Sequence, residues 1–145
     1  MTDSLESTVT WVDQVHFKAS GGTGHQVLMD GPEAAGGQNR GSRPMELILM
    51  GLGGCTAYDI VDILTKGRQD LVSMRTELRG ARAEDTPQTF THITIHFVIA
   101  GRGIDAAKVQ RAINMTAEKY CSASIMLARG GVTIEHSFEL VEAAA

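Results

Sequence analysis

An apolar segment in the middle of the chain restricts the folds that are open to it. The segment begins at Pro44, which suits the first position of a helix because the N–H that proline lacks is not needed there. From Leu47 to Leu64, apolar side chains fall on nearly every side of a helix, and Gly67 is placed to end it. Such a helix is expected to be buried all round, so the rest of the chain must cover it.

Alternating apolar and polar residues predict strands before and after this helix. The expected strands lie at residues 8–19 (two short strands with a turn near residue 13), 25–30, 72–79, 91–99 and 132–140. Asp105 is placed to cap a further helix that ends near Cys121, and Ser122 to cap a short helix that runs to Arg129. Strands and helices in this order, without a linker or repeat, predict one α+β domain over residues 1–145.

Composition excludes several classes of function. The 145 residues carry a net charge of −4 and no cluster of Lys or Arg, which argues against nucleic acid or an anionic membrane as a partner. No run approaches the roughly 20 apolar residues of a membrane span, and the acidic first residues do not resemble a secretory signal. A cytoplasmic location is therefore expected.

Two cysteines, Cys55 and Cys121, are the leading candidates for chemistry. Cytosolic thiols are kept reduced, so the pair is expected to be catalytic, redox-sensing or structural rather than a permanent disulfide. Free cysteines are also common buried apolar residues, and that reading stays open. Neither a C-x-x-C motif nor a Cys–His pair at ligand spacing is present, so no metal is expected, and no cofactor.

Three glycines, Gly51, Gly53 and Gly54, lie directly before Cys55. Each costs about 1 kcal/mol relative to alanine inside a helix. Their presence indicates either that another part of the chain packs very close or that a substrate must approach Cys55.

The two cysteine contexts together resemble the OsmC/Ohr family of thiol-dependent hydroperoxide reductases. The first context runs from Pro44-Met45-Glu46-Leu47 into Gly53-Gly54-Cys55, and the second is Glu118-Lys119-Tyr120-Cys121-Ser122-Ala123-Ser124. The order of the expected strands and helices extends the resemblance over essentially the whole chain.

The resemblance implies an OsmC-like fold, in which antiparallel sheets wrap around central helices in an intertwined homodimer. It implies a peroxidase in which Cys55 is the peroxidatic thiolate and Cys121 the resolving cysteine. Organic hydroperoxides, and hydrogen peroxide as a second possibility, are the implied substrates. An external dithiol, of the lipoyl type in one branch, is the implied reductant.

The residues that would activate Cys55 are less clearly matched. The reductases carry a Glu after the helix-opening proline and pair it with an Arg, whereas this chain has Met45 there and Thr23 in the turn that supplies the Arg. The candidates here are Glu46 with Arg43, or Arg40 in place of Arg43. On a continuous helix Glu46 lies about 13.5 Å from Cys55 along the axis, so it would serve the cysteine of the other subunit.

Three alternatives remain open at this point. Glu46 could instead be a first-turn acid that stabilises the helix dipole. The chain could likewise be an OsmC-like protein that binds a small apolar ligand or senses redox state, or a structural dimer module, because Met45 and Thr23 replace the reductase residues.

Overall fold

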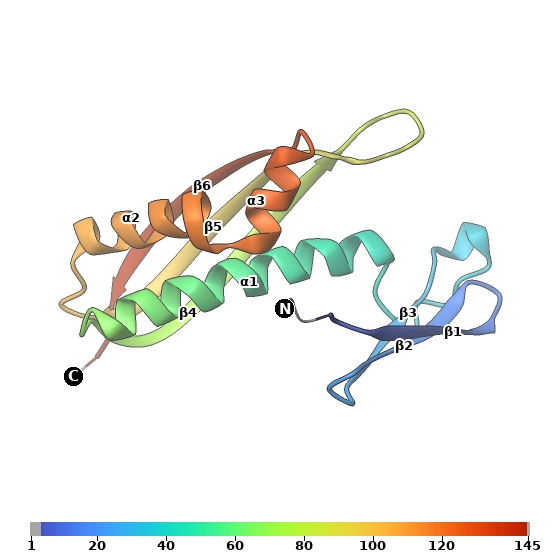
Figure 1. The fold of residues 1–145 in the computed structure, drawn as a ribbon, viewed down its shortest axis with the longest axis horizontal. Coiled ribbons are helices and arrows are strands. Elements are labelled where there is room, and N and C mark those ends of the chain that lie inside the picture. Colours follow the sequence, from blue (N-terminus) through green and yellow to red (C-terminus); the bar gives the residue numbers. More distant parts are fainter. Residues whose placement is uncertain (1–3, 145) are drawn as a thin grey trace. The chain divides into compact units, whose positions relative to one another are not determined.

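The computed structural model describes residues 4–144, and the chain divides into two compact units, residues 1–48 and 49–145. The helix α1 (Pro44–Lys66) begins at the end of the first unit and continues into the second. Figure 1 gives the course of the chain. The prediction of one domain over residues 1–145 stays a prediction.

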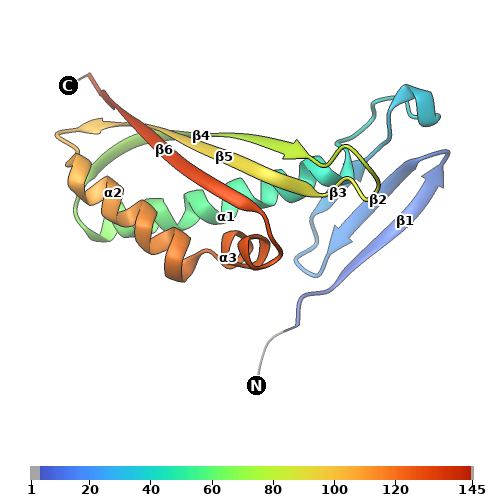
Figure 2. The same ribbon diagram turned by 90° about the horizontal axis from the view of Figure 1, so that it is seen from above.

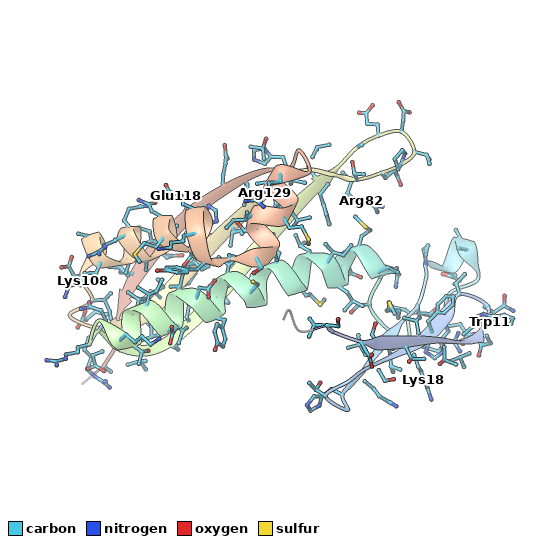
Figure 3. All side chains as sticks on the ribbon, in the orientation of Figure 1. Trp11, Lys18, Arg82, Lys108, Glu118 and Arg129 are labelled. Atoms are coloured by element: carbon cyan, nitrogen blue, oxygen red, sulfur yellow. The ribbon has the colours of Figure 1, made fainter. Side chains whose placement is uncertain are left out.

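The first unit is a small antiparallel sheet followed by a loop. Its strands are β1 (Ser7–Asp13), β2 (His16–Gly21) and β3 (Gln26–Met29), which lie where the alternating pattern predicts strands. They pair in sequence order. A 3-10 turn, η1 (Glu33–Ala35), lies in the loop. Trp11 of β1 is 65% exposed (Figure 3), so this unit leaves a large apolar side chain on its surface.

The second unit holds the larger sheet. It contains β4 (Asp70–Arg82), β5 (Phe90–Arg102), α2 (Ala106–Met115), the π-helical turn η2 (Thr116–Tyr120), α3 (Ser122–Arg129) and β6 (Thr133–Glu142). The sheet order is β4-β5-β6, and Figure 2 shows the helices on one of its faces. Asp105 caps α2 as predicted, since its side chain accepts a hydrogen bond from the Ala107 N–H.

The expectation of purely antiparallel sheets is wrong for this unit. β4 and β5 are antiparallel, but β5 and β6 pair in parallel, with Phe97 opposite Phe138. Parallel neighbours need a long crossover connection, and α2, η2 and α3 provide it by returning the chain along the sheet. Among the described residues, the two three-stranded sheets and the three α-helices otherwise agree with the predicted α+β class.

The core of the second unit lies between the sheet and the helices. Alternate residues of β5 point toward the helices and are fully buried, whereas their neighbours lie on the other face. The apolar core comprises Ile93, Ile95, Phe97 and Ile99 of β5, Leu52, Ile60 and Leu64 of α1, and Val109, Ala112 and Ile113 of α2.

The expectation that α1 is buried all round does not hold within one chain. Met50, Tyr58 and Val61 are 53%, 74% and 37% exposed, because only one side of the helix faces the sheet and α2. By length and composition α1 could also cross a membrane, with a mean hydropathy of 1.6, although no apolar run of that length was expected. Core helices of soluble proteins share this property.

Candidate functional site

The helix α1 places Cys55 and Asp59 one turn apart on the same side. Thr56, between them, is fully buried, and its hydroxyl donates a hydrogen bond of 2.8 Å to the Leu52 carbonyl oxygen. That bond fixes the Thr56 side chain. α1 runs unbroken through Gly51, Gly53 and Gly54, so Cys55 lies within a continuous helix.

Cys121 is positioned by a local widening of the helix that precedes it. The Cys121 N–H bonds to the Thr116 carbonyl oxygen at 2.8 Å, five residues earlier, which is the hydrogen bond of a π-helical turn. The chain then becomes extended at Cys121, and α3 begins. The cap of α3 is Cys121 itself rather than Ser122, because its sulfur accepts a hydrogen bond of 3.4 Å from the Ser124 N–H.

These two elements bring the two cysteines together, and Asp59 with them. The sulfurs of Cys55 and Cys121 and a carboxyl oxygen of Asp59 all lie within 4.8 Å of one another. Both cysteines are free thiols; Cys55 is partly exposed and Cys121 buried. Thr56 contacts the Cys121 sulfur at 3.4 Å through its hydroxyl.

Burial governs the electrostatics of this cluster. It raises the pKa of the Cys121 thiol, and the adjacent Cys55 thiol acts in the same direction. Burial also raises the pKa of Asp59, with a further contribution from the nearby Asp62 carboxylate. The Oδ2 atom of Asp59 is buried and has no hydrogen-bond partner among the described residues.

The other two predicted site residues, Arg43 and Glu46, contact each other at the start of α1. A carboxylate oxygen of Glu46 accepts a hydrogen bond of 2.9 Å from the Arg43 backbone N–H. This contact is one half of a capping box, in which the third helical residue bonds back to the cap. Glu46 therefore stabilises the first turn of α1, and Arg43 occupies the cap position directly before the helix.

The two candidate cations, Arg40 and Arg43, differ in whether a carboxylate pairs with their guanidinium group. Arg40 bonds the carboxylates of Asp13 and Asp30 and is thereby neutralised. Burial opposes ionisation of Asp30, but Arg40 and three backbone N–H groups hold its pKa well below the usual range. The Arg43 guanidinium, within residues 4–144, bonds only neutral oxygens, at Asn39 Oδ1 and the Asp30 and Gly41 carbonyls. Of the two, Arg43 is therefore the one whose positive charge is available to pair with an anion.

The glycines before Cys55 serve different purposes. A Cβ atom on Gly53 would lie 2.6 Å from the Leu78 Cδ1 atom of β4, so this glycine allows α1 to approach the sheet. A Cβ atom on Gly51 or Gly54 would meet nothing within 4 Å. Space is therefore open next to Cys55 on its Gly54 side. Close packing accounts for Gly53, and the approach of a substrate to Cys55 stays a prediction.

Sequence reasoning missed Asp59 and Thr56. Asp59 could have been found from its position four residues after Cys55, since such pairs share a helix face. Nothing in the sequence marks the contact of Thr56 with Cys121, which depends on the π-helical turn.

Comparison with known proteins gives consistent matches. The family model described as OsmC-like protein matches residues 37–137. The chain is 44% identical over 139 residues to Protein YhfA of Escherichia coli K12, covering 96% of this chain and 100% of that protein.

Solved structures agree in fold. A hypothetical protein from Aquifex aeolicus superimposes with a TM-score of 0.85 at 24% identity, covering 99% of this chain and all of that one. The organic hydroperoxide resistance protein OhrB of Bacillus subtilis superimposes with a TM-score of 0.64 at 18% identity, covering 94% and 98%. At these identities the likeness concerns the fold alone.

Proposed function

The chain belongs to the OsmC-like protein family, and we propose that it is a thiol-dependent peroxidase that reduces organic hydroperoxides through Cys55 and Cys121. The observation that carries the proposal is the pairing of a partly exposed thiol, with open space at Gly54, and a buried thiol within 4.8 Å. A peroxidatic cysteine must meet a bulky substrate, whereas a resolving cysteine needs only to reach its partner.

The first step oxidises Cys55. Its thiolate attacks the terminal oxygen of the hydroperoxide, so a sulfur–oxygen bond forms, the O–O bond breaks and an alkoxide leaves. The alkoxide takes a proton and departs as the alcohol. Cys55 is then a sulfenic acid, two electrons more oxidised.

The second step joins the two cysteines. Cys121 attacks the Cys55 sulfur, a disulfide forms, and the hydroxyl group leaves as water with the thiol proton. The sulfurs start within 4.8 Å, so they must move closer by less than about 3 Å to reach the disulfide length. An external dithiol, for which a lipoyl type is the candidate, then reduces the disulfide and restores both thiols.

Arg43 and Glu46 are proposed to assist at a second copy of the chain. The unbroken helix separates Glu46 from the Cys55 of its own chain by nine residues. Arg43 retains an unpaired charge among residues 4–144, and its backbone is tied to Glu46. We therefore assign Arg43 the role of stabilising the partner's Cys55 thiolate and Glu46 that of holding Arg43.

A homodimer is part of this proposal. The exposed apolar side chains of α1 border a hollow of about 820 Å³ between α1 and β4, lined by Tyr58, Val61 and Val72 among others. A single chain that exposes this much of its central helix has a face suited to a partner. The proposed setting is the cytoplasm, where a dithiol reductant is available.

Turnover with defined variants tests the proposal. The purified protein is supplied with cumene hydroperoxide and dihydrolipoamide, and loss of the hydroperoxide is followed. Cys55→Ser should abolish turnover, and Cys121→Ser should stop it after about one equivalent because the sulfenic acid is not resolved. Asp62→Asn, an exposed change on the same helix, is the matched control. Unchanged turnover in Cys55→Ser would overturn the proposal. If the unaltered protein does not turn over the hydroperoxide, ligand binding or redox sensing is favoured instead.

A further inference from the structure

We propose that Cys55, Asp59 and Cys121 form a site for a thiophilic divalent cation, zinc in particular. The three donors come from two elements: Cys55 and Asp59 from one side of α1, and Cys121 from the start of α3. This use of the residues is separate from the peroxidase function and does not depend on it.

The geometry is close to that of a zinc site. Zinc binds thiolate sulfur at about 2.3 Å and carboxylate oxygen at about 2.0–2.2 Å, usually with four ligands in a tetrahedron. Two sulfurs in such a tetrahedron lie about 3.8 Å apart. The three donor atoms here lie within 4.8 Å of one another, so a contraction of about 1 Å or less brings them to bonding distance.

A second observation points to a cation at this place. The Oδ2 atom of Asp59 is buried and has no hydrogen-bond partner among the described residues. Buried polar atoms are nearly always satisfied in native proteins, and one that is not calls for an unseen partner. A metal ion held between the carboxylate and the two sulfurs supplies that partner.

The surroundings leave Asp59 available to a metal ion. Asp62 lies near Asp59 but is paired with Lys66 at 2.9 Å, so of these two carboxylates only Asp59 is without a cationic partner among the residues that the structure describes. Cys121 is held in place by the Thr56 hydroxyl and the Ser124 N–H, both at 3.4 Å. Such outer contacts orient ligands in metal sites.

The donor set selects the class of metal. Two thiols favour soft or borderline ions such as zinc over magnesium or calcium, which prefer oxygen. Three protein ligands leave a fourth position for water or another ligand.

A hollow of about 280 Å³ lined by Asp59, Met115 and Tyr120 offers a path for the ion. Ligand spacing along the sequence does not predict this site, because its donors come from two separate elements.

Metal binding and peroxide reduction use the same sulfurs and exclude each other. A thiolate whose electron pair is bound to zinc does not attack an O–O bond as a free thiolate does. Zinc-loaded protein should therefore keep its thiols longer in the presence of a hydroperoxide.

Titration of the reduced, chelator-treated protein with zinc alone tests the site, using competition against a chromogenic chelator. We expect one zinc ion per chain, and cobalt(II) in its place should give thiolate-to-metal charge-transfer absorption. Asp59→Asn should weaken zinc binding by more than about tenfold. Mutating a residue that only bonds to a metal ligand already lowers metal affinity by about tenfold or more, and Asp59 is proposed as a ligand itself. Asp62→Asn, which alters an exposed carboxylate one turn away, should bind zinc nearly as the unaltered protein does.

Two results would overturn the proposal of a zinc site. One is the absence of stoichiometric zinc binding to the reduced protein. The other is binding that Asp59→Asn leaves unchanged, since two thiols alone would then account for it. No peroxide is present in this titration, so its outcome is independent of whether the chain is a peroxidase. A folded state of Asp59→Asn is verified by circular dichroism before the titration.

Discussion

Asp59 lies in an environment that disfavours its charged form. Its side chain is half-buried, one carboxyl oxygen is buried and lacks a partner among residues 4–144, and burial raises its pKa above the usual 3.8. An ionised Asp59 therefore destabilises the metal-free folded state.

The sign of the pH effect follows from this shift. The pKa of Asp59 is higher in the folded than in the unfolded chain, so its contribution favours folding below pH 3.8 and is lost as the pH rises through the folded pKa. Asn has nearly the same shape and no charge. Asp59→Asn should therefore raise the free energy of unfolding at pH 7.5, with a gain that shrinks toward pH 4.

Urea unfolding of chelator-treated protein at several pH values measures this gain. Asp62→Asn is the matched control, because Asp62 is exposed and paired with Lys66 at 2.9 Å. A gain for Asp59→Asn that does not change with pH would contradict the assignment of the effect to a buried carboxylate.

At the scale of the elements, the joint between α2 and α3 decides where Cys121 lies. The π-helical turn η2 ends α2 with the Cys121 N–H bonded to the Thr116 carbonyl oxygen, and Cys121 then caps α3. Serine is among the preferred caps, and loss of a cap costs typically about 1 kcal/mol.

Replacing the cap separates its structural role from its chemistry. Cys121→Ser keeps an acceptor for the Ser124 N–H, whereas Cys121→Ala removes it. We expect Cys121→Ala to unfold with a free energy about 1 kcal/mol lower than Cys121→Ser. Both variants should lack the resolving step, as turnover measurements would show. Equal stabilities in urea unfolding would mean that the sulfur contact at 3.4 Å does not cap the helix.

The sequence predicted the elements better than their connections. Alternation located the strands, and Pro44, Gly67 and Asp105 marked helix ends correctly, because these signals are local. The parallel pairing of β5 with β6 was not predicted, since alternation is the same for either strand direction. The π-helical turn carries no local signal either, because it is fixed by the packing on both sides of it.

The candidate site was predicted in part for the same reason. Cys55 and Cys121 are rare residues in distinctive contexts, so both could be named. Asp59 was missed although its spacing from Cys55 was readable. The contributions of Arg43 and Glu46 stay predictions.

At the scale of the whole molecule, the exposed apolar side of α1 favours a second copy of the chain. Tyr58 is 74% exposed, and Gly51 and Gly54 leave space on the helix around it. Tyr58→Lys should place a charge in the proposed interface and convert a dimer to a monomer, with a change in dissociation constant of at least about tenfold. Analytical ultracentrifugation measures this change.

Gln110→Lys is the control for that experiment. Gln110 lies exposed on α2 and bonds only Asn114 among the described side chains, so its replacement should leave the assembly unchanged. A Tyr58→Lys variant that stays dimeric, or an unaltered protein that is monomeric at high concentration, would place the interface elsewhere or remove it.

The measurement that addresses the peroxidase proposal most directly is mass-spectrometric thiol counting, before and after one equivalent of cumene hydroperoxide or hydrogen peroxide. The account predicts rapid loss of both thiols and a peptide cross-linked between Cys55 and Cys121, faster with the organic hydroperoxide. Survival of both thiols in reduced, metal-free protein would contradict it.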